Sequence, residues 1–337
     1  MKDFSDYSLK AHNTFGIEAR CCRFLEYATE GEAREVAAVL RQSALPYIII
    51  GGGSNLLLTR HFEGIVVHSA IKGCTLDETP TGALMTCGSG ETFDDMVAAS
   101  IAAGYSGLEN LSLIPGDVGA SAVQNIGAYG VEAKDAIRQV RAVEIATGQP
   151  CVFSPDDCRY GYRDSRFKHE WKNRYLITAV VYELQKTFVP RLQYGNISSE
   201  LQRRGIAEPT AQQLRELIID IRRRKLPDPA ETGNAGSFFM NPVVSRAKYE
   251  QLAAEYPDMP HYTVDDAHEK IPAGWMIEQC GWKGRALGRA GVYEKQALVL
   301  VNLGGATGAE VVSLCEAIRR DVSQRFGIAI NPEVNIV

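Results

Sequence analysis

The segment Gly107–Gly130 constrains the fold of this chain more than any other. It reads GLENLSLIPGDVGASAVQNIGAYG, with five glycines, almost no charge and neither helical nor strand periodicity, so we interpret it as a loop. Glycine permits positive φ angles and close approach of the main chain to a ligand, and the N–H groups exposed in this way bind anions. Long apolar loops are uncommon and usually functional. The segment therefore predicts a main-chain phosphate cradle, with a long surface connection as the alternative.

A second glycine-rich segment, Gly51–Asn55, follows the apolar run Tyr47–Ile50. It is not GxGxxG, and Leu56–Leu58 after it reads as extended, which disfavours a Rossmann site. The chain also lacks GxxxxGK[ST], which excludes a P-loop hydrolase. If the two glycine-rich segments converge on one diphosphate, they would suit a dinucleotide bound outside the Rossmann plan.

Length and composition limit the other classes of protein. A chain of 337 residues suits two or three domains, and a net charge of −5 gives no sign of nucleic-acid binding. Neither a secretory start nor an 18-residue apolar run is present, so we expect a cytoplasmic protein without membrane insertion. The eight cysteines lack CxxC and the six histidines lack HExxH, so we expect free thiols and no metal site.

Periodicity and capping signals predict a mixed α and β protein. Thr29, Ser154 and Thr307 each precede an acidic residue by three positions, which is the capping-box pattern. A cluster of turn residues at 228–236 predicts a domain boundary. The predicted helices are 30–41, 92–103, 211–225, 272–280 and 307–326, and the predicted strands are 21–27, 47–50, 64–68, 71–76, 84–87, 140–145, 175–184, 297–302 and 328–337.

Four polar positions are candidates for chemistry, each with a structural alternative. Arg163 in an aromatic-rich segment is either an oriented cation or half of a surface ion pair. The basic run Arg222–Lys225 either holds phosphate or only complements the dipole at a helix end. Ser237 lies in a tight, partly apolar segment without GxSxG, which disfavours acyl transfer. Glu333 is a lone acid in the predicted final strand.

Together these segments closely resemble the UDP-N-acetylenolpyruvoylglucosamine reductase family, flavoenzymes that complete UDP-N-acetylmuramate for bacterial peptidoglycan. The matching motifs follow the family's order and span nearly the whole chain. They are NTFG at 13–16, GGGSN at 51–55, the segment at 107–130, CRYGYRDSRFK at 158–168, KLPDP at 225–229, GNAGSFFMNP at 233–242, AGWMIEQCGWKG at 273–284 and PEV at 332–334.

The resemblance implies an α+β fold of three domains. Two of them form a non-Rossmann FAD-binding unit like that of vanillyl-alcohol-oxidase flavoproteins, namely residues 1–70, joined by a C-terminal strand at about 328–337, and residues 71–226. Residues 227–327 form a substrate-binding domain. The implied contacts to non-covalent FAD are Gly51, Gly52, Gly53, Ser54, Asn55, Pro115, Gly116, Gly119, Ala120, Ser121, Gln124, Asn125, Gly127, Ala128 and Tyr129.

The resemblance also implies the reaction. NADPH reduces the flavin, hydride passes from flavin N5 to C3 of the enolpyruvyl ether, and Ser237 protonates C2. Arg163 stabilises the enolate better than the starting carboxylate, and Glu333 either orders the proton path or, as a neutral acid, polarises the carboxylate. The implied partners are small molecules only, with a monomer expected. The implied substrate contacts are Tyr162, Tyr194, Arg222, Lys225, Asn241 and Gln296.

One position departs from the family pattern. Some members with the tyrosine loop at position 194 carry arginine two residues after the terminal glutamate, where this chain has Asn335. A second cation near Glu333 is therefore not expected. Two alternatives are a different FAD-dependent oxidoreductase, which predicts unrelated sequence after residue 227, and an inactive nucleotide-sugar-binding protein, which predicts loss of Ser237, Arg163 or Glu333.

Overall fold

A computed structural model describes all residues from Met1 to Val337. The chain forms two compact units. Unit 1 contains Met1–Tyr7, Cys21–Gly52 and Glu63–Arg224, and unit 2 contains Ser8–Arg20, Gly53–Phe62 and Lys225–Val337. The α+β fold class is confirmed, whereas the predicted boundaries of three domains stay a prediction.

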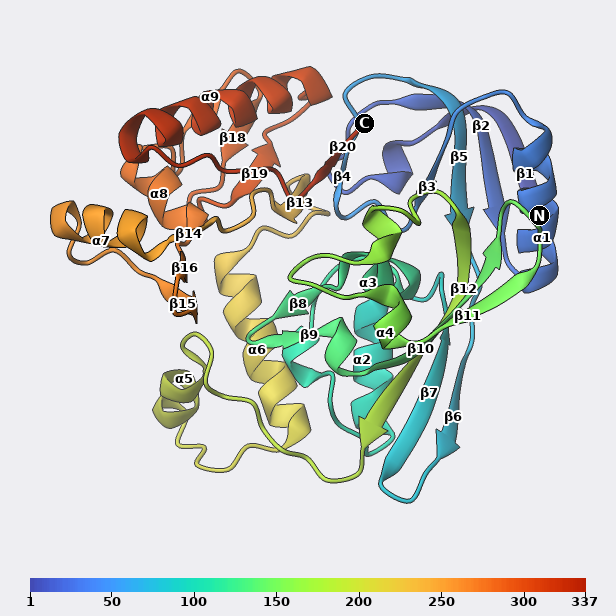
Figure 1. The fold of residues 1–337 in the computed structure, drawn as a ribbon, viewed down its shortest axis with the longest axis horizontal. Helices are drawn as coiled ribbons and strands as arrows, with labels where there is room; N and C mark the ends of the chain where they lie inside the picture. Colours follow the sequence, from blue (N-terminus) through green and yellow to red (C-terminus); the bar gives the residue numbers. More distant parts are fainter. The chain divides into compact units, whose positions relative to one another are not determined.

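The N-terminal part of unit 1 is a four-stranded sheet packed on one helix (Figure 1). The helix α1 (Glu30–Gln42) begins at Thr29, whose side chain accepts a hydrogen bond from the Glu32 N–H. Its predicted inner face, Ala33, Val36, Ala37 and Leu40, is buried. The sheet order is β1 (Lys2–Ser8), β2 (Arg20–Tyr27), β5 (Phe62–Ser69) and β3 (Tyr47–Ile50), with β3 and β5 parallel.

The larger part of unit 1 is a five-stranded antiparallel sheet. The Tyr27 hydroxyl of the first sheet donates to the Ile177 carbonyl of the second at 2.9 Å, which ties the two sheets together. The sheet order is β11 (Pro150–Phe153), β10 (Ile137–Glu144), β12 (Tyr175–Gln185), β7 (Gly82–Gly88) and β6 (Cys74–Glu78).

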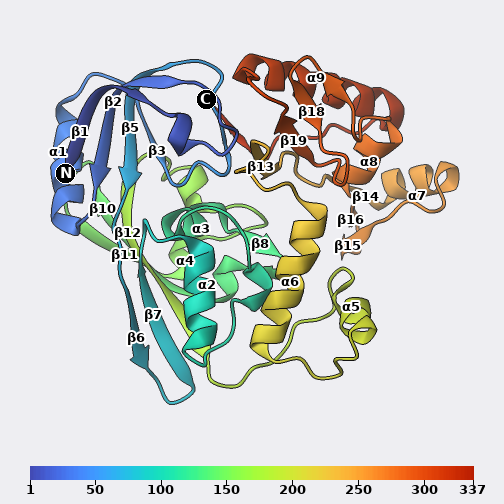
Figure 2. The ribbon, with the colours of Figure 1, turned by 180° about the vertical axis from the view of Figure 1, so that it is seen from behind.

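Helices lie beside this sheet, and both ribbon views place α2 between the sheet and α6 (Figures 1 and 2). The predicted inward residues of α6, Leu214, Leu217, Ile218 and Ile221, are buried. The helices are α2 (Phe93–Ala102), α3 (Val118–Gln124), α4 (Pro155–Cys158), α5 (Ile197–Arg203) and α6 (Ala211–Lys225), with a short ribbon of β8 (Gly127–Ala128) and β9 (Val131–Glu132) and 3-10 turns at Glu109–Leu111, Ala133–Asp135 and Arg166–Lys168.

Unit 2 is assembled from segments far apart in the sequence. The C-terminal β20 (Asn335–Ile336) pairs in parallel with β4 (Leu56–Leu57), and a 3-10 turn spans Lys10–His12. One sheet has the order β13 (Asn234–Ser237), β19 (Val299–Asn302), β18 (Ala290–Val292), β17 (Ala286–Leu287), and a second has β14 (Val243–Ser245), β16 (His268–Lys270), β15 (Tyr262–Asp265). The helices are α7 (Arg246–Glu255), α8 (Ala273–Gln279) and α9 (Gly308–Phe326).

Two predictions about local structure were wrong. The segment Gly107–Gly130 is not all loop, because it contains the helix α3, whose only two turns are too short for a helical periodicity to stand out. The predicted strand 328–337 is reduced to β20 and an isolated bridge at Pro332, so Glu333 lies between paired segments rather than inside a strand.

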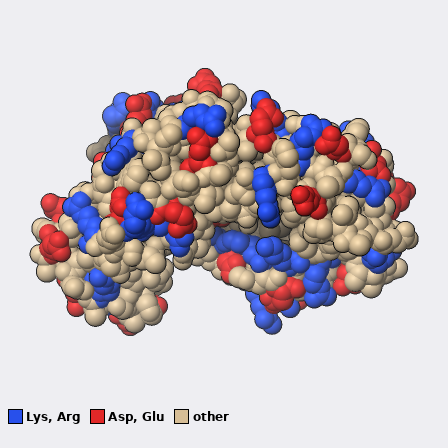
Figure 3. Space-filling model, turned by 90° about the horizontal axis from the view of Figure 1, so that it is seen from above, with Lys and Arg blue, Asp and Glu red and all other residues tan.

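The surface carries both signs of charge. Figure 3 shows acidic and basic side chains interspersed on the face in view, a pattern that gives no support to polyanion binding there. No helix in the structure has both the length and the apolar character needed to cross a bilayer.

Candidate functional site

The two glycine-rich segments meet in unit 1. A methyl group added at Gly51 would lie 3.2 Å from Ala120 Cβ, and one added at Gly52 would lie 3.0 Å from Asp117 Oδ1 and 3.6 Å from Gly116 Cα. Larger residues at 51 and 52 would therefore push the two segments apart. That the two segments hold a diphosphate stays a prediction.

Several predicted cofactor contacts in α3 are already occupied by the fold. The Gly119 N–H donates to the Ser89 carbonyl at 2.8 Å. The buried Ser121 hydroxyl lies 2.6 Å from the Tyr182 hydroxyl. Asn125, at φ 45°, donates to the Gly161 carbonyl at 2.7 Å and accepts from the Lys134 N–H at 3.0 Å. These polar groups are engaged in hydrogen bonds that fix the conformation of the segment. A ligand would therefore contact other atoms of the segment.

Gln124 differs from these neighbours. Its Oε1 is buried and has no hydrogen-bond partner. A buried acceptor left unpaired costs about 1–3 kcal/mol, so its presence in a native fold calls for an explanation. A ligand that brings an N–H group to this place would supply the missing donor.

Arg163 lies against the glycine-rich segment. Gly161 and Asp164 close a tight turn with reciprocal main-chain bonds of 3.0 and 3.2 Å, and Arg163 within it has φ 55°. The guanidinium donates to the carbonyls of Asn125 and Gly127 and lies 3.7 Å from a carboxylate oxygen of Glu132. The guanidinium also lies over the Tyr162 ring, 5.2 Å from its centroid. The surface-pair alternative is wrong, because the Arg163 side chain is only 18% exposed.

The tyrosine loop contacts the end of the glycine-rich segment. A methyl group added at Gly130 would lie 3.2 Å from Tyr194 Cβ, and Asn110 Nδ2 donates to the carbonyls of Tyr129 and Arg191 at 3.0 and 2.9 Å. The contribution of Asn110 was missed, because an asparagine in a loop has no sequence signal beyond a turn preference.

Arg222 is a largely buried cation of unit 1. Its Nε is buried without a hydrogen-bond partner. Burial lowers the pKa of the Arg222 guanidinium, and nearby Arg163 lowers it further, against Tyr129 and Asp94, which raise it. Arg223 and Arg224 are exposed, as is Lys225 at the end of α6. Arg222 thus differs from the exposed cations Arg223, Arg224 and Lys225. Its buried Nε without a partner could be satisfied by an anion.

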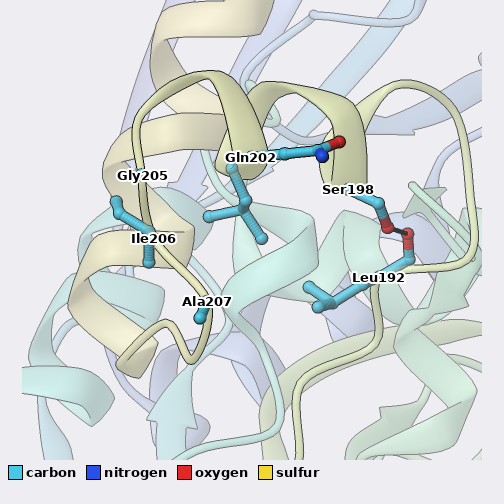
Figure 4. Close-up of a pocket in the computed structure, with 7 residues that line it drawn as sticks. Leu192, Ser198, Gln202, Gly205, Ile206 and Ala207 are labelled. Atoms are coloured by element: carbon cyan, nitrogen blue, oxygen red, sulfur yellow. Dashed lines mark hydrogen bonds between the residues drawn. The ribbon is translucent and has the colours of Figure 1, made fainter.

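A cavity in unit 1 lies away from these residues. It has a volume of about 420 Å³ beside α5, and none of the predicted site residues lines it (Figure 4). The Ser198 hydroxyl at its edge donates to the Leu192 carbonyl at 2.9 Å. Its lining carries no charge, which does not suit a phosphate; the lining residues are Leu192, Ser198, Leu201, Gln202, Gly205, Ile206 and Ala207.

In unit 2, the end of the first glycine-rich segment is held by the N-terminal motif. Gly53 has φ 68°, and its carbonyl accepts from the Thr14 N–H at 3.2 Å. Any Cβ at position 53 would overlap the His12 carbonyl. Asn55 Nδ2 donates to the Glu333 carbonyl at 3.3 Å, and Ser54 is half-buried between them.

Ser237 and Glu333 lie on adjoining segments of unit 2. The Glu333 N–H donates to the Phe238 carbonyl at 2.8 Å, and the Phe238 N–H donates to the Leu298 carbonyl at 2.7 Å. Phe238 is fully buried whereas Ser237, the preceding residue, is exposed. Successive side chains of an extended chain point to opposite faces, so Phe238 is buried while Ser237 is accessible to ligands.

The two predicted polar contacts of unit 2 lie around α8. Asn241 Oδ1 accepts from the Ala273 N–H at 2.9 Å, and Gln296 Oε1 accepts from the Leu298 N–H at 3.3 Å. The departure at Asn335 has a structural role, because its main-chain and side-chain nitrogens each donate to the Asn55 carbonyl at 3.1 Å.

Comparisons with known proteins agree with this architecture. A family model of the UDP-N-acetylenolpyruvoylglucosamine reductase C-terminal domain matches residues 228–337, and an FAD binding domain model matches residues 23–154. The α+β fold and these two matches define an FAD-dependent oxidoreductase of non-Rossmann type.

The similarity extends along the whole chain. A UDP-N-acetylenolpyruvoylglucosamine reductase from Bacteroides fragilis is 51% identical over 98% of this chain and 99% of its own length. One from Burkholderia pseudomallei is 47% identical over 97% of this chain and 95% of its own length. The chain belongs to the UDP-N-acetylenolpyruvoylglucosamine reductase family. The crystal structure of the Thermus caldophilus enzyme, at 23% identity, shares the fold with a TM-score of 0.66 over 99% of this chain and 98% of that one.

Proposed function

We propose that this chain reduces the enolpyruvyl ether of UDP-N-acetylglucosamine enolpyruvate to UDP-N-acetylmuramate with NADPH as the reductant. The observation that carries the proposal is the 51% identity to the Bacteroides fragilis reductase over nearly the full length of both chains. Ser237, Arg163 and Glu333 are all present, which disfavours an inactive binding protein. The match over residues 228–337 disfavours an oxidase that shares only the FAD domains.

Features of unit 1 fit FAD. Gly51 and Gly52 lie so close to Gly116–Ala120 that an added Cβ would press on Asp117 and Ala120, so glycine keeps the main chain of both segments together. The orphaned Gln124 Oε1 suits the ring N–H of a flavin. When bound, FAD supplies the hydride that it has received from NADPH. The residues that would hold it are the fifteen positions of the glycine-rich segments named in the sequence analysis, with Gly119, Ser121 and Asn125 contributing through atoms other than those bonded within the fold.

The protein's own residues stabilise the negative charge that develops on the substrate and supply the proton. As C3 gains hydride, negative charge grows on the substrate carboxylate, and the permanent cation of Arg163 stabilises that charge. Ser237 delivers a proton to C2, with Glu333 ordering its path. Arg222 and Lys225 bind the nucleotide diphosphate, and Tyr162, Tyr194, Asn241 and Gln296 contact the rest of the substrate. One NADPH and one proton are consumed for each enolpyruvyl group reduced.

The test separates the two half-reactions of a Ser237→Ala variant. Under anaerobic conditions NADPH should bleach its flavin at the wild-type rate, and the enolpyruvyl nucleotide should restore the colour about 10²–10⁴-fold more slowly, which is the usual contribution of a general acid. Ser313→Ala, at an exposed serine of α9, is the matched control and should behave as wild type.

Two outcomes would contradict the proposal. Equal slowing of both half-reactions would remove the assigned role of Ser237. Bleaching of the wild-type protein that only oxygen reverses would favour a flavin oxidase instead.

A further inference from the structure

A line of charged side chains runs from the N-terminal sheet to the glycine-rich segments. Lys2 Nζ lies 2.6 Å from Glu26 Oε1, and Glu26 Oε2 lies 3.1 Å from His68 Nδ1. The other ring nitrogen, His68 Nε2, lies 3.5 Å from Asp117 Oδ2. The Glu26, His68 and Asp117 side chains are only 15–16% exposed. Elements β1, β2 and β5 and the residue before α3 thus contribute one member each.

This geometry favours the imidazolium form of His68. A neutral imidazole has one N–H, so one ring nitrogen would present its lone pair to a carboxylate. Only the doubly protonated ring can face both carboxylates favourably. Burial lowers the pKa of His68, but Asp117 and Glu26 outweigh it and raise the pKa above its ordinary value.

The far end of this line faces the first glycine-rich segment. The Asp117 carboxylate oxygens would lie 3.3 and 3.0 Å from methyl groups added at Gly51 and Gly52. A carboxylate in this place would repel the diphosphate of FAD if its charge were not offset. Asp117 lies in the glycine-rich segment 107–130 but was assigned no role there, and no sequence motif pointed to His68.

We propose that His68 is a positioning residue for the cofactor, which as an imidazolium holds the Asp117 carboxylate against Gly51 and Gly52 and offsets its charge beside the FAD diphosphate. The proposal rests on the proposed FAD site at the two glycine-rich segments. The charged groups that raise the pKa of His68 are Asp117 and Glu26. Lys2 faces Glu26 from β1, and the uncharged Phe24 ring stacks on the imidazole with centroids 6.2 Å apart.

The experiment is a titration of the apoprotein with FAD, followed by flavin fluorescence. At pH 6.5, His68→Gln should weaken FAD binding about 10–100-fold, because a neutral side chain leaves the Asp117 charge exposed to the diphosphate. Asp117→Asn alone should bind FAD at least as tightly as wild type. The double variant His68→Gln/Asp117→Asn should regain affinity to within about threefold of wild type, because without the carboxylate no cation is needed.

Rescue distinguishes charge compensation from simple structural support. A His68→Gln variant with wild-type affinity, or one whose weakness persists in the double variant, would overturn the proposal. If His68→Gln does not fold, the pH series decides. FAD binding by wild type should weaken as pH rises from 6 to 9, and binding by Asp117→Asn should change less; parallel profiles would overturn the proposal.

Failure of the FAD site itself gives a different result. Gly52→Val should abolish FAD binding if the diphosphate lies at this segment, because the side chain would meet Asp117. Wild-type affinity in Gly52→Val would show that FAD binds elsewhere, and the role of His68 would fall with the site. Loss of binding in Gly52→Val with no effect of His68→Gln would remove only the role of His68.

Discussion

The Arg163 guanidinium occupies the place that a side chain at position 127 would need. A methyl group at position 127 would lie 2.6 Å from Arg163 Nη1 and 2.7 Å from the Val131 carbonyl, so only glycine leaves room for the guanidinium. The guanidinium donates to the main chain of the glycine-rich segment, which fixes the direction of its fork. A planar fork that is fixed in this way can serve a developing carboxylate charge without further reorganisation.

This gives a prediction for Arg163→Lys. Lysine keeps the charge but loses the fork, so kcat should fall about 10²–10³-fold, the usual loss when one donor to a developing oxyanion is removed. The flavin spectrum should stay unchanged, and Arg138→Lys, at a side chain that is 63% exposed, is the matched control. Turnover within threefold of wild type would show that the orientation of Arg163 does not matter.

Single residues could be named from the sequence where a motif sets their place, and their roles stay predictions. Arg163, Ser237 and Glu333 come from motifs, and the structure puts the last two on adjoining segments. Asp117 and His68 could not be predicted, because their meeting depends on how β5 is aligned with α3. No local pattern encodes that contact.

At the scale of elements, α6 is fixed to α2 by an ion pair. Arg215 Nη1 and Nη2 lie 2.6 and 3.0 Å from the two Asp94 oxygens, and the side chains are only 11% and 20% exposed. Burial raises the pKa of Asp94, but Arg215 and the Leu113 N–H outweigh it and lower the pKa. The stabilisation is therefore present above the ordinary pKa of 3.8 and is lost as pH falls below it.

Asp94→Asn should lower the free energy of unfolding by about 2–3 kcal/mol, because it leaves a mostly buried guanidinium without its carboxylate. Urea unfolding at pH 7 would measure this loss. The double variant Asp94→Asn/Arg215→Met should recover at least half of it, since no unpaired charge is left. A double variant as unstable as the single one would show that packing, not charge, dominates the contact.

Elements with long apolar faces and clear caps were predictable from sequence. The helices α1, α6 and α9 were found with their inner faces, and Thr307 and Glu310 make the predicted capping box. Three others, α3, α5 and α7, were not found. The helices α3 and α5 are short and have no side-chain cap, and α7 buries only Leu252, so none displays a long periodic apolar face.

At the scale of the whole molecule, the chain crosses between its two units several times. Unit 2 combines residues 8–20, 53–62 and 225–337, and the single glycine-rich segment 51–55 is divided between the units. The pairing of β20 with β4, for example, could not be predicted from the local sequence of either strand. Proximity between residues almost three hundred positions apart leaves no periodicity in either segment.

Removal of FAD should lower the thermal stability of the whole molecule. FAD binds only the folded chain, so apoprotein should melt at a lower temperature than protein with excess FAD. At 100 times the dissociation constant the difference corresponds to about 2.7 kcal/mol. Differential scanning calorimetry would measure it, with AMP as a ligand control that lacks the flavin. Equal melting temperatures would contradict cofactor binding to the native state.

The buried Nε of Arg222 has a consequence for how this protein could evolve. A guanidinium donor without a partner costs about 1–3 kcal/mol, which the free protein bears permanently. An apolar residue of similar length would fit the same place and make the fold more stable. Selection for thermal robustness alone would thus discard this arginine, whereas selection for anion binding would keep it. The position records a trade-off in which the resting protein is held below its attainable stability.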